Sequence, residues 1–354
     1  MAAFLDVCRF NPTLGGTTDW TFSSAVTGYQ GPTAAGAVNG ATYRYRAESA
    51  DLLQWEIGYG AYNSGTGVFS RSTVLFNSAS TTVKINFSTV PQVAIVALAE
   101  DLLVPRSFLA GLTLSTAGSS ATFGVAVGLA ADSTNVDMLS LASAFTKTTG
   151  AWALGTTAGS LDTGAIANST WYHAFLIKRP DTGVIDVLTS LSATAPTLPV
   201  NYTLFRRIGS MKTNGSAQWT KFIQDGDSFT WDIPVADVNV TNPGTAAVTR
   251  TLTLPTGVRV KALLSVGGTV LASDPGPNAI YISDLSVSDQ AAAQGGAVSF
   301  QVTQPASATQ AVMGQVSVMT NTAAQVRSRV QSSTANVVLV MNTNGWVDRL
   351  GRDA

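Results

Sequence analysis

The chain carries a single histidine, His173, inside the segment STWYHAFLIK. Histidine is the side chain whose ordinary pKa best suits proton transfer near neutral pH, so this residue is the first candidate for acid–base chemistry. Successive side chains of a strand point to opposite faces, which places His173 in a row with Trp171, Phe175 and Ile177. A general base needs a reacting group within hydrogen-bond reach, and this row offers only aromatic and aliphatic neighbours. The pattern favours a neutral imidazole packed in a β-sheet.

Motifs for nucleophilic catalysis and for phosphate binding are absent from the sequence. It contains no Gly-x-Ser-x-Gly elbow, and a Ser/His/Asp triad would have to use His173. It also contains no Gly-x-x-x-x-Gly-Lys-Ser/Thr loop for phosphates. We therefore predict that the protein is not an enzyme, with no catalytic residue and no cofactor-binding residue.

Metal ligands are equally scarce. The run DGDSFTWD brings Asp225, Asp227 and Asp232 close together in the sequence, which could suggest calcium. It lacks the other ligands of a calcium loop and the closing glutamate, so a polar turn before a strand is the preferred interpretation. One cysteine, Cys8, and one histidine exclude an ordinary Cys/His zinc site and an intramolecular disulfide. We predict no metal site.

Glycoside hydrolysis is the one chemistry that the residue types leave open, because it needs only two carboxylates about 5 to 10 Å apart. Of the 21 acidic residues, only Glu48, Glu56 and Glu100 are glutamates, and no pair stands out. Four aromatic residues could stack on sugar rings, although aromatic residues of β domains more often lie in the core. They are Trp152, Trp171, Tyr172 and Trp219. A polysaccharide depolymerase therefore remains an alternative.

The composition excludes several classes of partner. Charged residues make up 12% of the chain, about half the usual share, and they nearly cancel to a net charge of −1. No basic field attracts nucleic acid or anionic lipid. The longest apolar run, VAIVALA at 93–99, is too short to span a bilayer, and the start MAAFLDVCRF has no basic n-region of a signal peptide. We expect synthesis in a cytoplasm, no nucleic-acid partner and no membrane insertion.

The elements that would position any site are strands. The chain is rich in threonine, serine, valine, alanine and glycine, and short strand patterns recur between Gly, Asn, Pro and Asp residues. This is typical of sandwiches and barrels, so we predict an all-β fold. A surface covered by uncharged polar side chains suits packing against identical neighbours, because few charges would need burying there.

The pattern divides the chain into three predicted domains. Residues 1–101 form an N-terminal β domain in which Tyr43 and Tyr45 alternate with Arg44 and Arg46, followed by a turn at 63–67. Pro105 marks the boundary to a middle β domain at 102–233. In that domain we expect one helical turn at 137–145.

The third predicted domain, 234–354, shows about eight short strands, the count of a jelly roll or a similar β-sandwich. Within it, the alternating residues from Val258 to Val266 form one apolar face, and Arg327 and Arg329 alternate with Val326 and Val330 as on a half-exposed strand.

Several segments together resemble a known family. They include VTGY at 26–29, the strand at Tyr43, WEIG at 55–58, RSTVL at 71–75 and KINFSTVPQVAIVALAEDL. This part resembles an N-terminal domain found on virion proteins of tailed phages and prophages, especially those of alphaproteobacteria. The segment from NSTWYHAFLIKRPDTGV to FTWDIPV is similar to a distal module of phage fibre or spike proteins, and GWVDRLGRDA is similar to the close of the same proteins.

The resemblance implies a structural component of a tailed-phage virion, a short fibre or spike subunit that attaches to a host surface, with no catalytic residues to carry over. Its N-terminal domain would dock on other virion proteins of the tail, baseplate or capsid. Its later domains would present loops to a host-surface polysaccharide, and the resemblance also implies a homotrimer. Such a protein is assembled in the host cytoplasm and located in the virion. The receptor-binding residues are not indicated. A capsid decoration or head fibre without a receptor role, and a depolymerase tailspike, are the alternatives.

Overall fold

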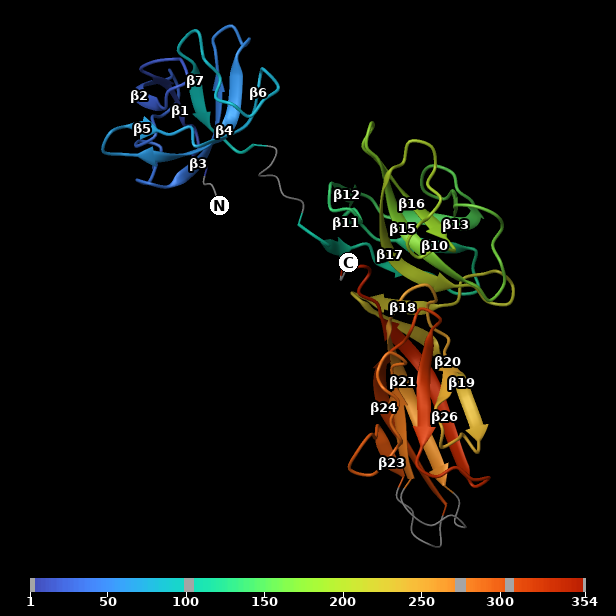
Figure 1. Ribbon diagram of the computed structural model, residues 1–354. Helices are drawn as coiled ribbons and strands as arrows, with labels where there is room; N and C mark the ends of the chain where they lie inside the picture. Colours follow the sequence, from blue (N-terminus) through green and yellow to red (C-terminus); the bar gives the residue numbers. More distant parts are fainter. Residues whose placement is uncertain (1–3, 99–104, 271–277, 303–308, 353–354) are drawn as a thin grey trace. The chain divides into compact units, whose positions relative to one another are not determined.

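The computed structural model describes residues 4–98, 105–270, 278–302 and 309–352. These residues form 26 β-strands and no helix, so the predicted all-β fold class is confirmed. It follows that the described residues contain no helix capable of crossing a membrane. The chain separates into two compact units, 1–103 and 104–354, coloured blue to cyan and green to red in Figure 1.

The first unit is built from seven strands. They are β1 (Arg9–Pro12), β2 (Trp20–Ala25), β3 (Thr42–Glu48), β4 (Trp55–Asn63), β5 (Val68–Phe69), β6 (Thr73–Asn77) and β7 (Gln92–Ile95). They pair in the order β3-β7-β1-β2-β5-β4-β6, and an additional pairing joins β3 to β4. That pairing closes six of the strands into a ring with β6 attached to β4, which leaves the closed part without a free edge.

The core of the first unit is aromatic. Tyr43 and Tyr45 are buried in β3, as their alternation with Arg44 and Arg46 predicted. The ring of Tyr45 meets the edge of Trp20 at 4.8 Å between centroids. The predicted turn joins β4 to β5, where Gly67 has a φ of +68°, a conformation that glycine adopts without strain.

The second unit begins with two sheets. Their strands are β8 (Leu109–Gly111), β9 (Leu114–Ser115), β10 (Thr122–Val125), β11 (Gly128–Ala131), β12 (Met138–Leu141), β13 (Phe145–Ala151), β14 (Gly159–Leu161), β15 (Trp171–Arg179), β16 (Val184–Ser190) and β17 (Leu204–Lys212). One sheet has the order β17-β15-β16-β14-β13-β10-β9, and the other has the order β12-β11-β8. The prediction of a helical turn at 137–145 is wrong. Residues Met138–Leu141 form strand β12, which pairs with β11 and buries alternate side chains.

The remainder of the second unit is a β-sandwich. Its strands are β18 (Phe222–Asp225), β19 (Ser228–Thr241), β20 (Val248–Thr251), β21 (Lys261–Val270), β22 (Asn278–Ser283), β23 (Phe300–Val302), β24 (Gln310–Met319), β25 (Gln325–Val330) and β26 (Val337–Val347). A five-stranded sheet, β18-β19-β26-β21-β24, packs on a four-stranded sheet, β20-β25-β22-β23. The apolar row of β21 is buried between the two sheets, and β25 alternates as the sequence predicted.

The predicted division at residue 233 falls inside β19, a single strand of 14 residues. The hydrophobic core runs across this point without a break, from Leu112 to Leu350. Trp171 of β15 touches Trp346 of β26 edge to face, with 5.4 Å between the ring centroids. Residues 104–354 consequently form one compact unit in which the sandwich and the sheets before it share a core.

Candidate functional site

His173 lies inside the sheet, as the aromatic row predicted. Its side chain is 1% exposed, and Trp171, Tyr172 and Phe175 beside it are also buried. The register of β15 and β17 sets His173 directly opposite Ser210, and Nδ1 of the imidazole is 2.9 Å from the Ser210 hydroxyl. The one histidine of the chain is therefore a satisfied core residue.

The surroundings keep this imidazole neutral. Burial, and to a smaller extent the nearby Arg207 guanidinium, lower the pKa of His173 to about 4, against the opposing effects of Asp348 and of a hydrogen bond with the Thr256 backbone. An imidazole with this pKa is uncharged at neutral pH, with a proton on only one ring nitrogen, and is a weak base.

The arrangement contains a serine, a histidine and an aspartate, but it is not a catalytic triad. Asp348 binds Arg207, with Oδ2 and Oδ1 at 2.6 and 2.8 Å from the two guanidinium nitrogens, and it does not contact the histidine ring. Arg207 also donates to the Ser210 hydroxyl at 3.3 Å. Ser210 has no exposed surface, so no substrate carbonyl can reach its hydroxyl.

The acidic run that could suggest calcium forms a hairpin. Asp225 ends β18, Asp227 lies in the turn, and Asp232 follows on β19. Asp232 forms an ion pair with Lys221 at 3.0 Å, and Asp227 pairs with Arg352. In the described ranges no cluster of three His, Cys, Asp or Glu side chains could hold a metal ion. The preferred interpretation, a polar turn before a strand, agrees with this geometry.

Most of the aromatic residues considered for sugar stacking are inside the core. Trp171, Tyr172 and Trp219 are buried, and Trp152 is half-buried against Tyr202. Their faces contact other side chains, so none of the three buried rings offers a stacking platform to a ligand.

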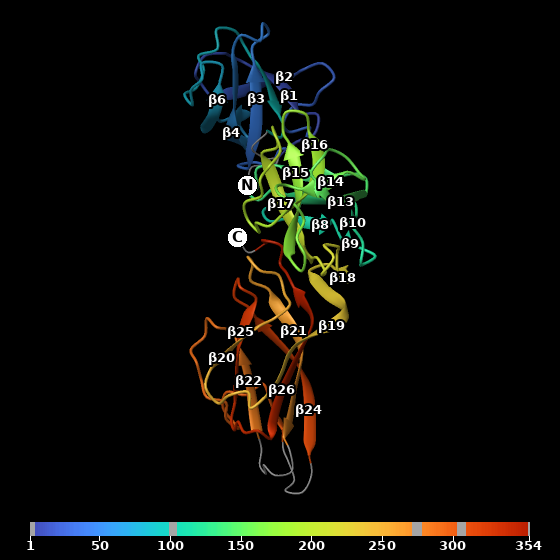
Figure 2. The same cartoon turned by 90° about the vertical axis from the view of Figure 1, so that its right-hand side faces the viewer.

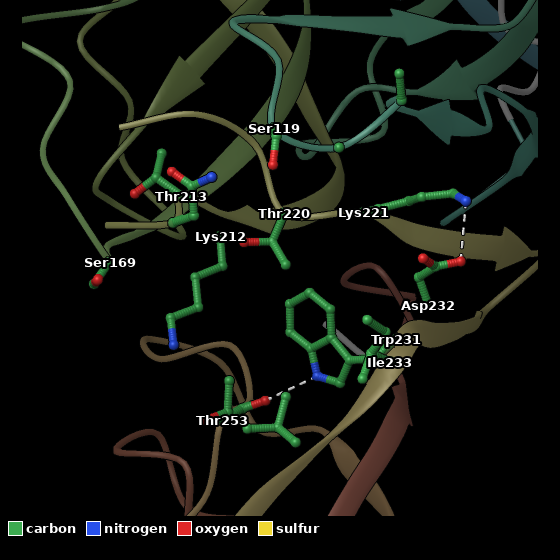
Figure 3. Close-up of a pocket in the computed structure, with 14 residues that line it drawn as sticks. Ser119, Ser169, Lys212, Thr213, Thr220, Lys221, Trp231, Asp232, Ile233 and Thr253 are labelled. Carbon is green, nitrogen blue, oxygen red and sulfur yellow. Dashed lines mark hydrogen bonds and ion pairs between the residues drawn. The ribbon is translucent and has the colours of Figure 1, made fainter. Parts of the chain in front are cut away.

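An open hollow with polar and apolar walls lies where β17 ends and the β18–β19 hairpin begins. Its volume is about 440 Å³, and Figure 3 shows the residues that line it. The wall is formed by the loop at 117–119, the end of β17 with residues 213–214, the hairpin, and Thr253. The position follows from the fold, because the hairpin leaves the sandwich at this point and reaches the neighbouring sheet.

Hydroxyl groups and one ion pair dominate the polar wall of this hollow. Ser119, Ser169 and Thr220 contribute hydroxyls, and Lys221 and Asp232 face each other as an ion pair. The Trp231 indole, which lines the hollow, donates a hydrogen bond to the Thr253 carbonyl at 3.2 Å, and this bond holds the ring in place. Figure 3 shows both interactions as dashed lines.

Lys212 is the unpaired charge of the hollow. It is half-buried at the end of β17, and its ammonium extends into the open space in Figure 3. Its backbone carbonyl accepts a hydrogen bond from Thr220 N at 2.8 Å, but no described residue forms a hydrogen bond or an ion pair with its ammonium. The hollow therefore offers an ammonium, several hydroxyls and an apolar rim at Ile233, which is 76% exposed.

The side chains of this hollow are of types that can bind a polar ligand. It contains one carboxylate, Asp232, which is already paired with Lys221, so the two carboxylates of glycoside hydrolysis are not both present there. Hydroxyl and ammonium groups can hold a polar ligand with an acidic group through charge-assisted hydrogen bonds.

No pattern in the sequence predicts this hollow, because its lining comes from several segments that are far apart in the chain and most of its polar residues are of types that are common throughout it. Lys212 and Lys221 are the residues of the lining that stand out in the sequence, since lysine is scarce there. No protein-family model matches the chain, and comparison with curated proteins finds no significant match.

Proposed function

We propose that this protein is a structural subunit of a tailed-phage virion, a short fibre or spike that attaches to a host-surface glycan. The first unit would dock on other virion proteins, and the second unit would carry the glycan contact. The proposal starts from the resemblance of the segments at 26–29, 43, 55–58 and 71–75 and of the later modules to phage fibre and spike proteins.

The observation that carries the non-enzymatic part of the proposal is the burial of the reactive groups. The single histidine is locked in the core, and the open hollow at Lys212 has binding groups without a carboxylate pair. A protein that acts through shape and association needs this combination of a closed core and a polar, accessible surface.

Two of the resembling segments also meet in the core of the first unit. Glu56, from WEIG, and Arg71, from RSTVL, form an ion pair whose side chains have no exposed surface. Arg71 further donates to the carbonyls of Gly16 and Ile85, at 3.0 and 2.9 Å. Tyr45 donates to Glu56 at 2.7 Å. Residues of this kind specify a rigid scaffold, which a docking domain requires.

The second unit has scaffold pairs of the same type. Lys147 and Asp186 are fully buried and 2.9 Å apart, and Lys147 also donates to the carbonyls of Ala153 and Gly155. In a chain with so few charges, burying them in such networks is consistent with a rigid particle component.

A truncation tests the docking role. The 1–101 segment is nearly the whole first unit, so its deletion leaves the second unit intact. We expect the truncated chain to be folded and soluble and to be missing from purified particles, whereas the full chain expressed from the same vector is incorporated. Incorporation of the truncated chain would refute the assignment of docking to the first unit.

An activity measurement tests the absence of catalysis. Purified full chain incubated with host polysaccharide should release no reducing ends while it binds the polymer. Release of reducing ends that scales with protein concentration would favour the depolymerase alternative.

A further inference from the structure

Strand β24 forms one edge of the five-stranded sheet. It is ten residues long and pairs only with β21, which leaves its other side without a strand partner among the described residues. Figure 2 shows it at the margin of the sandwich. Alternate residues of β24 are exposed, and Met313 and Met319 are 59% and 38% exposed.

The register shows which backbone groups of β24 remain free. Thr320 N donates to Val260 O at 2.9 Å, and Lys261 stands opposite Met319 at the next step. In an antiparallel ladder, pairs that bond to each other alternate with pairs whose N–H and C=O groups point away from the partner strand. The even-numbered residues of β24 therefore bond to β21. The odd-numbered residues direct their N–H and C=O groups to the open edge, and they are Ala311, Met313, Gln315, Ser317 and Met319.

This edge lacks the features that normally keep two edges apart. The sequence QAVMGQVSVM has no charge and no proline, and its pairing with β21 contains no bulge. Long, uncharged, regular edges of this kind are templates for another strand.

The opposite edge of the same sheet is protected. Beyond the hairpin with β18, strand β19 carries Asp232, Pro234 and Asp237, and bulges interrupt its pairing with β26. Asp237 also accepts hydrogen bonds from Thr253 N and the Thr253 hydroxyl, both at 2.7 Å, which brings a loop over this edge. The contrast between the two edges indicates that β24 is left open for a partner.

Residues of β24 at equal distances on either side of Val316 are similar or compatible in type, so the strand can pair with a reversed copy of itself. In an antiparallel arrangement centred on Val316, Met313 stands opposite Met319 of the second copy, and Gln315 stands opposite Ser317. All four positions are odd-numbered, so each pair can exchange two backbone hydrogen bonds. The methionines then bury each other, and the Ser317 hydroxyl lies beside Gln315, whose amide also bonds to Ser265 and Asn344 in its own sheet. The contact contains no charge.

We propose that two copies of this chain associate through antiparallel pairing of their β24 strands about Val316, forming one continuous sheet across the two sandwiches. The contact is isologous, because the same strand serves both copies. The inference goes beyond the proposed function and does not depend on it. The homotrimer implied by the resemblance is a competing arrangement.

Oligomeric state and one backbone variant test the contact. By sedimentation equilibrium, the full chain should have the mass of two copies. Gln315→Pro removes an N–H that points to the open edge and leaves the backbone hydrogen bonds with β21 in place. It also removes the exposed side-chain bonds of Gln315 to Ser265 and Asn344. We expect this variant to have the mass of one chain with an unchanged circular dichroism spectrum.

A charge variant covers the case in which the proline disturbs folding. Ser317→Lys places two like-charged groups in the contact and should weaken association at least tenfold. Thr241→Lys, an exposed residue on the protected β19 edge, is the matched control and should leave the mass unchanged. A wild-type monomer, or a trimer that keeps its mass in Gln315→Pro and Ser317→Lys, would overturn the proposal.

Disulfide formation tests the register. A Gln315→Cys chain mixed with a Ser317→Cys chain should form a cross-linked pair under mild oxidation. Neither variant alone should do so, because like positions are then offset by about 7 Å along the strand. Cys8 does not interfere, since it is buried and burial raises the pKa of its thiol to about 11. Absence of the mixed cross-link would exclude pairing about Val316.

Discussion

Arg207 and Asp348 stand 141 residues apart in the sequence and join the two halves of the second unit through two hydrogen bonds of 2.6 and 2.8 Å. Arg207 belongs to β17, and Asp348 follows β26 of the sandwich. Asp348 also accepts a hydrogen bond from Leu350 N at 2.9 Å, so both of its carboxylate oxygens have partners. This pair links the two halves across the predicted division at 233, beside the hydrophobic core that they share.

Removing one member of this pair should strongly destabilise the second unit. Asp348→Ala leaves a buried guanidinium without its partner, and we expect a loss of about 3–5 kcal/mol in the free energy of unfolding. Chemical denaturation followed by tryptophan fluorescence measures it.

The control for this prediction is Asp181→Ala, which breaks the exposed pair of Asp181 with Arg179 and should leave the denaturation midpoint nearly unchanged. Equal effects of Asp348→Ala and Asp181→Ala would contradict the structural role of the buried pair.

His173 should make the stability of the second unit depend on pH. Its pKa in the folded protein is about 4, below its ordinary value of 6.5, so between these values the unfolded chain binds a proton that the folded chain does not. The contribution of His173 to the free energy of unfolding is fully present above pH 6.5. It is lost as the pH falls towards 4, by about 3 kcal/mol in all.

The measurement is the free energy of unfolding between pH 5 and 7, where no other side chain with an ordinary pKa titrates. His173→Gln retains a group that can hydrogen-bond to Ser210 and should flatten the profile in this range. A profile that is equally steep in the variant would show that another group is responsible.

The buried pair in the first unit should act on that unit alone. Arg71→Ala leaves Glu56 buried without its partner, and we expect a loss of about 3–5 kcal/mol in the stability of residues 4–98. Hydrogen exchange read by mass spectrometry should show lost protection in the first unit and unchanged protection in the second, because the two units are separately compact.

Lys84→Ala is the matched control for Arg71→Ala in the same unit, since it breaks a half-exposed pair with Asp19. It should leave the exchange pattern almost unchanged. Loss of protection in both units after Arg71→Ala would refute their independence.

The hollow at Lys212 should bind acidic rather than neutral glycans. Lys212→Ala removes its unpaired ammonium and should weaken binding of an acidic host polysaccharide about tenfold or more, with a smaller effect at high salt. Surface plasmon resonance on immobilised polysaccharide measures this change. Lys261→Ala, which removes an exposed lysine of β21, is the control and should bind as the wild type does. Equal binding by the Lys212 and Lys261 variants would show that the hollow does not bind the acidic glycan.

Strand alternation predicted much of the local structure correctly. It placed Tyr43 and Tyr45 in the core, buried His173, and described the half-exposed arginines of β25. These succeed because the period of two in a strand is imposed by the backbone and is visible in a short window.

The expected helical turn at 137–145 failed for a related reason. Met138, Leu141 and Phe145 fit a helical spacing, but Met138 and Leu141 pair across to β11, and a short apolar pattern does not distinguish the two structures. Features that depend on distant segments were not visible at all. The hollow at Lys212 and the Arg207–Asp348 pair both need the three-dimensional fold to bring their parts together.

Locating the chain on particles would show whether it is a virion component that acts by association. Phage particles from the host that carries this gene would be purified on a density gradient, analysed by mass spectrometry and labelled with gold-conjugated antibodies against the second unit. We expect the full chain to co-purify with the particles and the gold to mark a fixed position on the tail, baseplate or capsid. Recovery of the chain only in the soluble fraction of the lysate, with unlabelled particles, would contradict the proposal that it is a virion component.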